Sequence, residues 1–354
     1  MTQESQMVEQ ASDSKNSHNH NEHRNPWMWL AGIMAVVIVV MSFALGYLVA
    51  GRNQPAAEQQ PTAQQQENQP TAEQVKQLKE TMDAVGERPS NVDDEGLIVI
   101  SKNGYGAPVK DVPTVTVFEE PLCPFCGQLN RALDPTLVKL VDAGQINLKI
   151  GLVNFLDQVS SDSYSTRAVN GAVTILEQDD DPHHLMTYLA NLYDEDWMPQ
   201  EGQNYKPVSN DMLRERALAA GVDQQVADQV FDVQSKYEQW ADAMTSYTTS
   251  RVELWGEGQL GFSTPAVLIN DEYWPVSNAL SDTSKAGKAL FDAIGLKPNE
   301  AGNARVKPSI GAKGKPIARR DGDEHGQHDQ HSRRTARRAA SSGGRDAGPG
   351  AGCE

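Results

Sequence analysis

Hydrophobic and polar positions divide the chain into successive segments. A polar arm over residues 1–26 precedes an almost uninterrupted apolar run at 27–51, and residues 52–95 are rich in Gln, Pro, Ala and Glu. From 96 to 297, apolar residues recur at strand and helix spacing, whereas 298–354 has no such periodicity. The pattern predicts one transmembrane helix, a solvated linker, one folded domain and a disordered basic tail.

The apolar run is long enough to cross a hydrocarbon core of about 30 Å as a single helix. Trp27 and Trp29 at one end and Tyr47 near the other occupy positions typical of interfacial aromatic residues. A cleaved signal peptide is the alternative, but its apolar region would span about 7–15 residues after a short basic start. We therefore expect an uncleaved signal anchor at 27–51, in contact with membrane lipid.

Basic residues around this run favour a cytoplasmic N-terminus. Lys15 and Arg24 precede it, and Arg52 is the only basic residue for some distance after it. Because positive residues tend to remain on the cytoplasmic side, we expect a single-pass protein of the cell membrane with its folded domain outside. Within the linker we expect a short helix over 75–85, ended by Gly86.

The first half of the folded domain alternates between strand and helix patterns. Residues 97–100 and 112–119 indicate strands, a helical pattern follows, and residues 146–153 indicate the next strand. Pro135 falls inside the helical pattern and predicts a kink or a break there. A strand, a crossover helix and a second strand form a βαβ unit with parallel pairing, which predicts an α/β fold.

From about 161 to 258 the pattern is helical. We expect helices at 165–177, 183–193 and 211–220, and a fourth over 226–247, where apolar residues step by four and three. Sheet then returns as a hairpin over 265–276, and a last helix at 283–294 ends at Gly295.

Charge is distributed unevenly. The net charge is −17, yet residues 303–354 alone carry 11 Lys/Arg and 6 Asp/Glu, a net of +5. The remainder therefore carries −22. An acidic folded domain makes nucleic acid an unfavourable partner.

Two of the three cysteines lie in the motif Cys123-Pro124-Phe125-Cys126, where the 112–119 strand pattern gives way to a helix. Proline suits the first helical position, which makes Cys123 the expected N-cap, facing unpaired N–H groups and the positive end of the helix dipole. Such a pair can close a small disulfide ring and exchange it with another protein. Cys353 lies in the Gly-rich tail and has no assigned role.

A zinc site is the alternative interpretation of these cysteines. Zinc needs about four ligands, and the chain has no second CxxC. His183 and His184 are better explained as a solvated helix start, and the histidines at 325, 328 and 331 as part of a flexible polar run. We expect no metal and no cofactor beyond a Cys123–Cys126 disulfide.

Two carboxylates precede the motif. Glu119 and Glu120 end the strand pattern just before Pro121. Carboxylates are usually exposed, so a solvated strand end is one interpretation. The other is that one of them relays protons for Cys126, which must lose its proton to attack a mixed disulfide.

Two phrases in this order resemble the DsbA-like branch of the thioredoxin superfamily, in particular the membrane-anchored proteins of Gram-positive bacteria. They are the CPFC motif with Leu122 before it, and residues 261–270, with the helical segment between them. The resemblance covers roughly 112–296 and implies a thioredoxin fold with a long helical insertion. It departs at Phe125, where many oxidising relatives have histidine, and at Val117, where relatives often have a buried acid.

The resemblance also implies roles. Cys123 would be the nucleophile, Cys126 the resolving thiol, Pro265 a cis-proline beside the disulfide, and Thr264 the residue whose backbone pairs with a bound client. The implied function is disulfide formation in exported proteins, with a membrane reoxidase as partner. A reductase or isomerase, or a tethered peptide-binding module without redox turnover, are the alternatives.

The departure at Phe125 affects the expected acidity and potential. We expect a Cys123 pKa below ~8.5 but above the ~3.5 of the most oxidising relative. The potential is correspondingly expected between about −270 and −120 mV. An oxidising compartment suits a lone redox pair in a cysteine-poor chain.

Overall fold

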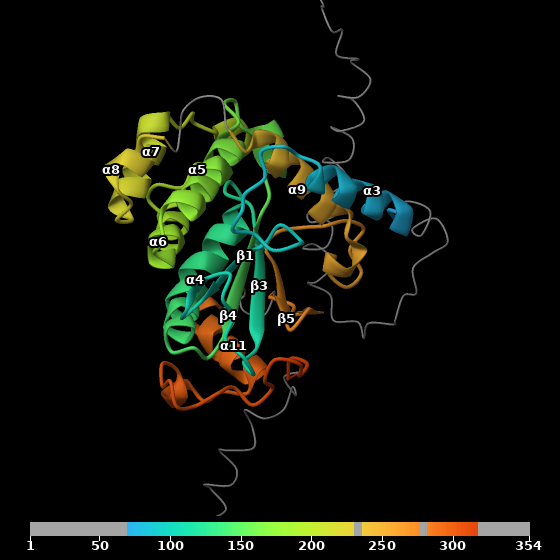
Figure 1. Ribbon diagram of the computed structural model, residues 1–354, viewed down its shortest axis with the longest axis vertical. Helices are drawn as coiled ribbons and strands as arrows, with labels where there is room; N and C mark the ends of the chain where they lie inside the picture. Colours follow the sequence, from blue (N-terminus) through green and yellow to red (C-terminus); the bar gives the residue numbers. More distant parts are fainter. Residues whose placement is uncertain (1–68, 230–235, 277–279, 281, 318–354) are drawn as a thin grey trace, which may run out of the picture. The chain divides into compact units, whose positions relative to one another are not determined.

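The computed structural model describes residues 69–229, 236–276, 280 and 282–317. At its centre lies a six-stranded mixed sheet in the order β2-β1-β4-β3-β5-β6 (Figure 1). The strands are β1 (Ile98–Ser101), β2 (Gly104–Tyr105), β3 (Thr114–Glu119), β4 (Asn147–Leu152), β5 (Ala266–Ile269) and β6 (Glu272–Tyr273).

The middle strand β3 pairs in parallel with β4 and antiparallel with β5. Val117 lies opposite Ile150 on one side and Val267 on the other. Alternating residues of β3 point to opposite faces, and both Val117 and Phe118 are buried, so the strand is covered on both faces. The βαβ unit predicted from the sequence is therefore present. The short edge strand β2 was not predicted.

Helix α4 (Pro124–Asp142) connects β3 to β4. Cys123 is its N-cap and Pro124 its first residue, as expected. The helix continues through Pro135, so the predicted break is absent. Leu129 and Leu133 before the proline and Leu137 and Leu140 after it are all buried, and this packing offsets the backbone hydrogen bond that proline removes.

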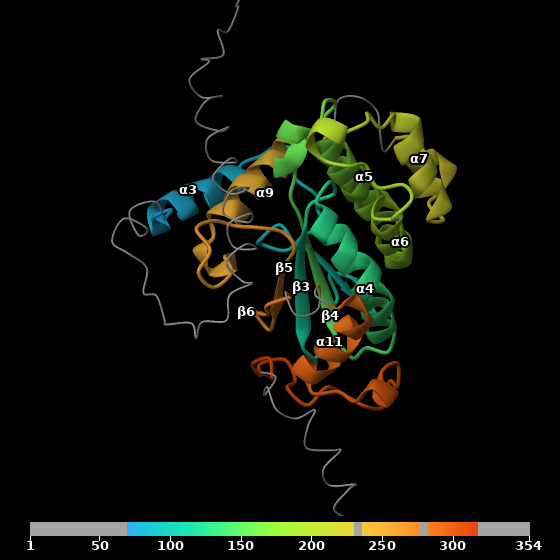
Figure 2. The ribbon, with the colours of Figure 1, turned by 180° about the vertical axis from the view of Figure 1, so that it is seen from behind.

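The helical insertion follows β4. It contains α5 (Tyr164–Gln178), α6 (Pro182–Leu192), α7 (Asn210–Ala219), α8 (Gln224–Ala227) and α9 (Glu238–Ser250), with the 3-10 turns η1 (Phe155–Val159), η2 (Gly202–Asn204) and η3 (Val252–Leu254). Helix α6 packs against α5, α7 and α4, and α5 also packs against α9 (Figures 1 and 2).

The single helix predicted over 226–247 is wrong. Helix α8 ends at Ala227 and α9 begins at Glu238, with 230–235 outside the described residues. Immediately before α9, the Tyr237 N–H donates to the buried Asn170 side chain at 3.2 Å. Tyr237, Trp240 and Met244 are nevertheless buried, as the apolar stripe predicted.

The segment before β1 packs on the domain instead of remaining solvated. Helix α3 (Ala72–Asp83), with Thr71 as N-cap, corresponds to the short helix expected in the linker and lies against α9 (Figure 1). Farther on, the backbone N–H groups of Ser90 and Asn91 donate to Glu177 of α5 at 2.9 and 3.0 Å. The expected linker at 52–95 is therefore part of the packed structure from residue 69 onward.

The C-terminal elements complete the sheet and cover α4. Asn270 and Asp271 both have positive φ in the turn between β5 and β6, as expected of a tight hairpin. The 3-10 turn η4 (Thr283–Lys285) leads into α11 (Ala286–Ile294), which packs against α4 and ends at the left-handed Gly295. The predicted last helix is confirmed.

The chain beyond Lys297 differs from the expected disordered tail as far as residue 317. After η5 (Pro298–Glu300), the Gln145 side-chain amide donates to three carbonyls, those of Glu300, Asn303 and Val306, at 2.9–3.3 Å. The Asn270 amide likewise donates to Gly311 and Gly314. Hydrogen bonds from these two side-chain amides to backbone carbonyls hold the segment, and such bonds produce no apolar periodicity in the sequence.

The predicted transmembrane helix at 27–51 lies outside the described residues. Within the part of the chain that is described, no helix combines the length and apolar character needed to cross a bilayer.

Candidate redox site

The site lies where β3 ends and α4 begins. Cys123 and Cys126 are free thiols, and both are buried, with 6% and 1% of their surface exposed. The loop that precedes β5 brings Thr264 against Cys123 from a distant part of the sequence, with Cys123 Sγ 3.4 Å from the Thr264 carbonyl oxygen. The two parts of the predicted site, the CPFC motif and the Thr264–Pro265 segment, are therefore in contact.

The surroundings of Cys123 favour its thiolate. A hydrogen bond from the Cys126 thiol, the Thr264 hydroxyl and the backbone N–H groups of Cys126 and Phe125 lower the Cys123 pKa to about 7, against the opposing effect of burial. This value lies in the interval that the sequence predicted. A large part of Cys123 is therefore ionised near neutral pH.

Cys126 has the opposite tendency. Burial, followed by the neighbouring Cys123 and the charge of Glu119, raises the Cys126 pKa well above its ordinary value. Of the two thiols, Cys123 is therefore the more acidic, and Cys126 holds its proton more tightly.

The peptide bond between Thr264 and Pro265 is cis, as the resemblance implied. Thr264 is 8% exposed and presents its carbonyl and its hydroxyl to Cys123. At the rim of the site, Phe125 is 46% exposed although the two cysteines of the motif are buried, and Leu260, five residues before the cis-proline, is 57% exposed. Exposed apolar side chains therefore lie in the motif itself and in the loop that faces it.

The two glutamates are not a solvated strand end. Glu119 is 7% exposed and Glu120 is fully buried. Glu120 accepts hydrogen bonds from the backbone N–H groups of Leu122, at 2.6 Å, and Leu156, at 3.3 Å, and so fixes the loop that carries Cys123.

Glu119 has a different environment. Its Oε2 atom has no hydrogen-bond partner among the described residues, although the Tyr193 side chain and Cys126 lie beside it. Burial raises the Glu119 pKa to about 7, with Tyr193 lowering it and Cys123 raising it further. Of the two carboxylates, Glu119 is thus the one whose charge acts on Cys126.

The sequence analysis missed the residues that cover the thiols. Tyr193, at the end of α6, is fully buried against both cysteines, and Leu156 and Met198 pack on the same cluster. Arg131 of α4 donates to the Tyr193 carbonyl at 2.6 Å and so ties this cover to the helix of the site. No local pattern marks these residues, because the contacts join segments about 60 residues apart.

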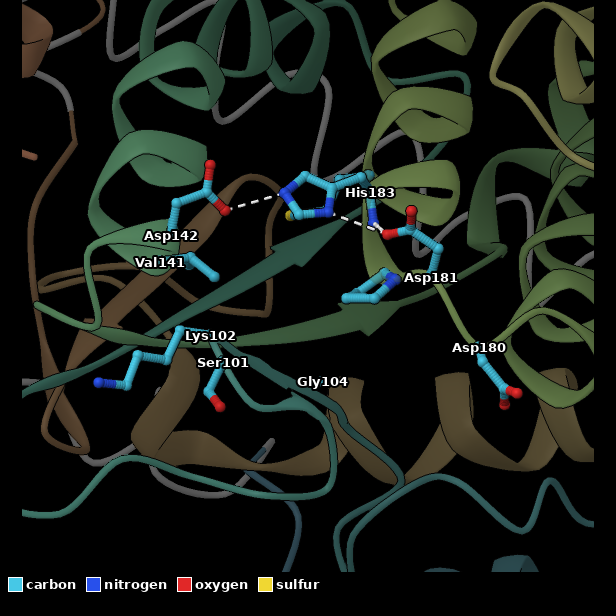
Figure 3. A pocket seen from close by; sticks show the side chains of 10 residues that line it. Ser101, Lys102, Gly104, Val141, Asp142, Asp180, Asp181 and His183 are labelled. Atoms are coloured by element: carbon cyan, nitrogen blue, oxygen red, sulfur yellow. Dashed lines mark hydrogen bonds and ion pairs between the residues drawn. The ribbon is translucent and has the colours of Figure 1, made fainter.

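A second hollow, of about 420 Å³, is lined by residues including Ser101, Lys102 and His183. Figure 3 shows His183 between two carboxylates, with Nε2 2.8 Å from Asp142 and Nδ1 2.9 Å from Asp181. Among the described residues no group of His, Cys, Asp and Glu side chains has the arrangement of a metal site. His183 thus links the end of α4 to the start of α6.

Two thiols at a helix N-terminus, opposite a cis-proline on a central mixed sheet, define a thioredoxin fold with a thiol–disulfide exchange site, into which a helical domain is inserted. A family model described as "Thioredoxin" matches residues 105–286, and the chain belongs to this family. The predicted membership of the thioredoxin superfamily is confirmed, and the dithiol pair is that of a thiol–disulfide oxidoreductase.

Among curated proteins, the serine/threonine-protein kinase PknE of Mycobacterium tuberculosis is 36% identical over 89 residues. The match covers 25% of this chain and 16% of the kinase, so the chain spans less than a fifth of that relative's length.

Similar solved structures are thiol–disulfide proteins of bacteria. MdbA of Actinomyces oris has a TM-score of 0.46 and 15% identity, over 60% of this chain and 93% of that one. MdbA of Corynebacterium matruchotii has a TM-score of 0.43 and 21% identity, over 62% of this chain and 98% of that one. DsbA of Mycobacterium tuberculosis in its reduced form has a TM-score of 0.41 and 22% identity, over 54% of this chain and 98% of that one.

Proposed function

We propose that the protein introduces disulfide bonds into exported proteins on the outer side of the cell membrane, through the Cys123–Cys126 pair. The observation that carries the proposal is the difference between the two thiols. One is an N-cap with a pKa of about 7 beside Thr264, and the other is buried with a raised pKa. Such a pair is suited to accept a client on Cys123 while Cys126 leaves as the second thiol.

The exchange proceeds in two steps. A client thiolate attacks Cys123 Sγ of the oxidised pair, a new S–S bond forms, and Cys126 leaves as a thiolate and takes up a proton. A second client thiolate then attacks the client sulfur of the mixed disulfide and releases Cys123 as a thiolate. The client loses two electrons, and the protein gains them as the dithiol.

The acidity of Cys123 favours oxidation of clients over their reduction. Its thiolate is stabilised only in the reduced protein, which makes the disulfide the better oxidant. Since about 30 mV corresponds to about 1.4 kcal/mol, or one pKa unit, lowering the Cys123 pKa from 9.0 to about 7 raises the potential by up to about 60 mV, with the full effect at a pH above both values. A reductase or isomerase would also attack client disulfides through this thiolate, so the potential of the pair is what separates these alternatives.

Glu119 is the proposed proton partner of Cys126. Near neutral pH a carboxyl with a pKa of about 7 exists in both forms, so it can donate a proton to the Cys126 thiolate or remove one from the thiol. Glu120 has a positioning role instead, because backbone N–H groups occupy both of its oxygens.

The remaining elements of the proposal concern its setting. The expected anchor at 27–51 would hold the domain at the lipid surface, and a membrane reoxidase would restore the disulfide. The alternative of a peptide-binding module without redox turnover has less support, because a binder has no need of two thiols with opposed acidities.

Client trapping tests the function. Cys126→Ser should accumulate mixed disulfides through Cys123 in cells, because the resolving thiol is absent, and Cys123→Ser serves as the matched control that should trap few. An impermeant thiol reagent should label Cys123 in intact cells after mild reduction. Equal trapping by both variants, or labelling only after lysis, would refute the assigned roles or the topology respectively.

The potential of the Cys123–Cys126 pair against glutathione decides the direction. We expect a value between about −270 and −120 mV. A value at or below the lower limit would favour the reductase alternative.

A further inference from the structure

A small cavity of about 20 Å³ lies between β3, β4, α4 and α6, with Glu119 of the redox site in its lining. Seven of its ten lining residues are apolar, and its three polar side chains are Glu119, Asn130 and Asp134. A volume of this size holds about one water molecule, and a water there needs polar partners such as these.

Glu119 forms the inner end of this cavity. Its side chain is more than nine-tenths buried, and Oε2 has no hydrogen-bond partner among the described residues. An unpaired buried oxygen is unfavourable unless a water or a proton-bearing group satisfies it. On its other side Glu119 faces Cys126, which itself has no direct route to solvent because Tyr193 and Met198 cover the thiols.

Asp134 forms the outer end. It lines the cavity and also an open groove of about 500 Å³ between α4 and α6, where exposed residues such as Glu195 and Asp196 meet solvent. Asn130, one helical turn earlier, donates to Asp134 Oδ2 at 2.5 Å and holds the carboxyl in place. Asp134 thus stands between the interior of the protein and the solvent.

We propose that Asp134, together with a water in the cavity, completes a proton path that runs from Cys126 through Glu119 to the groove between α4 and α6. The inference rests on the proposed role of Glu119 and extends it. When Cys126 leaves as a thiolate, Glu119 gives it a proton, the cavity water reprotonates Glu119, and Asp134 reprotonates that water from solvent. When Cys126 must ionise, each proton moves the other way.

The electrostatics of the two carboxyls agree with this role. Burial, and then the charge of Glu119, raise the Asp134 pKa, while the Asn130 hydrogen bond lowers it. Each of these two neighbouring carboxyls therefore resists ionisation while the other is charged. The other titratable groups around them are Cys123, Cys126, Tyr193 and Glu120 on the inner side, and Arg131, His183, Asp194, Glu195 and Asp196 along the groove.

The test follows the resolving step alone, in the full-length protein. Cys123 is loaded with glutathione, and the release of glutathione by Cys126 is timed by acid quenching and mass spectrometry between pH 5 and 9. Asp134→Asn keeps the volume and the bond to Asn130 but cannot carry the proton. It should slow release about tenfold, less than the ~100-fold or more expected of the direct partner in Glu119→Gln.

Formate provides a readout that a merely structural role would not change. Asp134→Ala leaves space at the floor of the groove, and added formate should restore its release rate toward that of wild type. Formate should not rescue Glu119→Gln, because the inner cavity holds about one water. Glu195→Gln, which removes a carboxylate of the same groove away from the cavity, is the control and should match wild type.

Two results would overturn the proton path: Asp134→Asn releasing glutathione within twofold of wild type at every pH, or folded Asp134→Ala failing to respond to formate. Client trapping by Cys126→Ser does not involve Asp134, so a failure there would count against the proposed function and not against this path alone.

Discussion

Replacing Glu119 with glutamine should make the reduced protein more stable above neutral pH while slowing its chemistry. Burial raises the Glu119 pKa from an ordinary 4.5 to about 7, so the folded state binds this proton more tightly than the unfolded state does. The resulting stabilisation is complete below pH 4.5, declines as the pH rises, and is lost above about 7. Glutamine never ionises and avoids this loss.

The magnitude follows from the same values. One pKa unit corresponds to about 1.4 kcal/mol, so the difference between 4.5 and about 7 corresponds to about 3 kcal/mol in the free energy of unfolding. Glu119→Gln should therefore exceed wild type by up to about 3 kcal/mol at pH 8 and by little at pH 4. The Cys126 pKa should fall as well, because the charge of Glu119 helps to raise it.

Urea unfolding of both reduced proteins, repeated from pH 4 to 8.5, measures this difference directly. Glu257→Gln, which removes an exposed carboxylate from the loop before β5, controls for the loss of one negative charge. A stability difference that stays constant with pH would show that Glu119 does not resist ionisation, and both its proposed role and the path through Asp134 would lose their basis.

Three further predictions concern other parts of the molecule. Phe125→His should lower the Cys123 pKa below about 7 and also raise the redox potential, because an imidazole N–H or its charge would stabilise the thiolate. Titration of thiolate absorbance measures the pKa, and equilibration with glutathione measures the potential. A change in only one of these two quantities would contradict the link between them. His183→Gln should destabilise the protein by ~0.2–1 kcal/mol below pH ~6.5 and not at pH 9. The reason is that hydrogen bonds to Asp181 and then Asp142 raise the pKa of this half-exposed histidine. An equal loss of unfolding free energy at both pH values would exclude an ionic contribution. Gly151→Ala should cost about 1–3 kcal/mol in the free energy of unfolding, because its Cβ would lie 2.5 Å from Phe118 Cδ1, and thermal unfolding unchanged from wild type would show that the ring can move aside.

The sequence predicted those features that depend on local pattern. Cys123 as N-cap and the βαβ unit follow from residue spacing and capping chemistry, and both are present. The cis bond at Pro265 required the family resemblance, because nothing local distinguishes it. Its meeting with Cys123 is a contact across 141 positions of the chain.

What the sequence could not predict was set by distant contacts. Carboxylates at a strand end are usually exposed, and only the packing of the insertion over the site, including Tyr193, shows that Glu119 is buried. Asp134 stands beside a leucine of the α4 stripe, and that position gave no indication of the cavity behind it. Likewise the helix expected across 226–247 is interrupted where Asn170 takes the Tyr237 N–H, a contact that no periodicity records.

The segment after α11 stabilises the domain at a place far from the redox site. Gln145 and Asn270, which hold the segment to Ile317, lie at the amino ends of β4 and β3, whereas the thiols lie at the carboxyl end of β3. Substitutions of Gln145 or Asn270 should change the resistance of the domain to heat and protease without altering the acidity of Cys123. Selection or engineering can therefore adjust the lifetime of the catalyst and its oxidising strength independently, at opposite ends of the central strands.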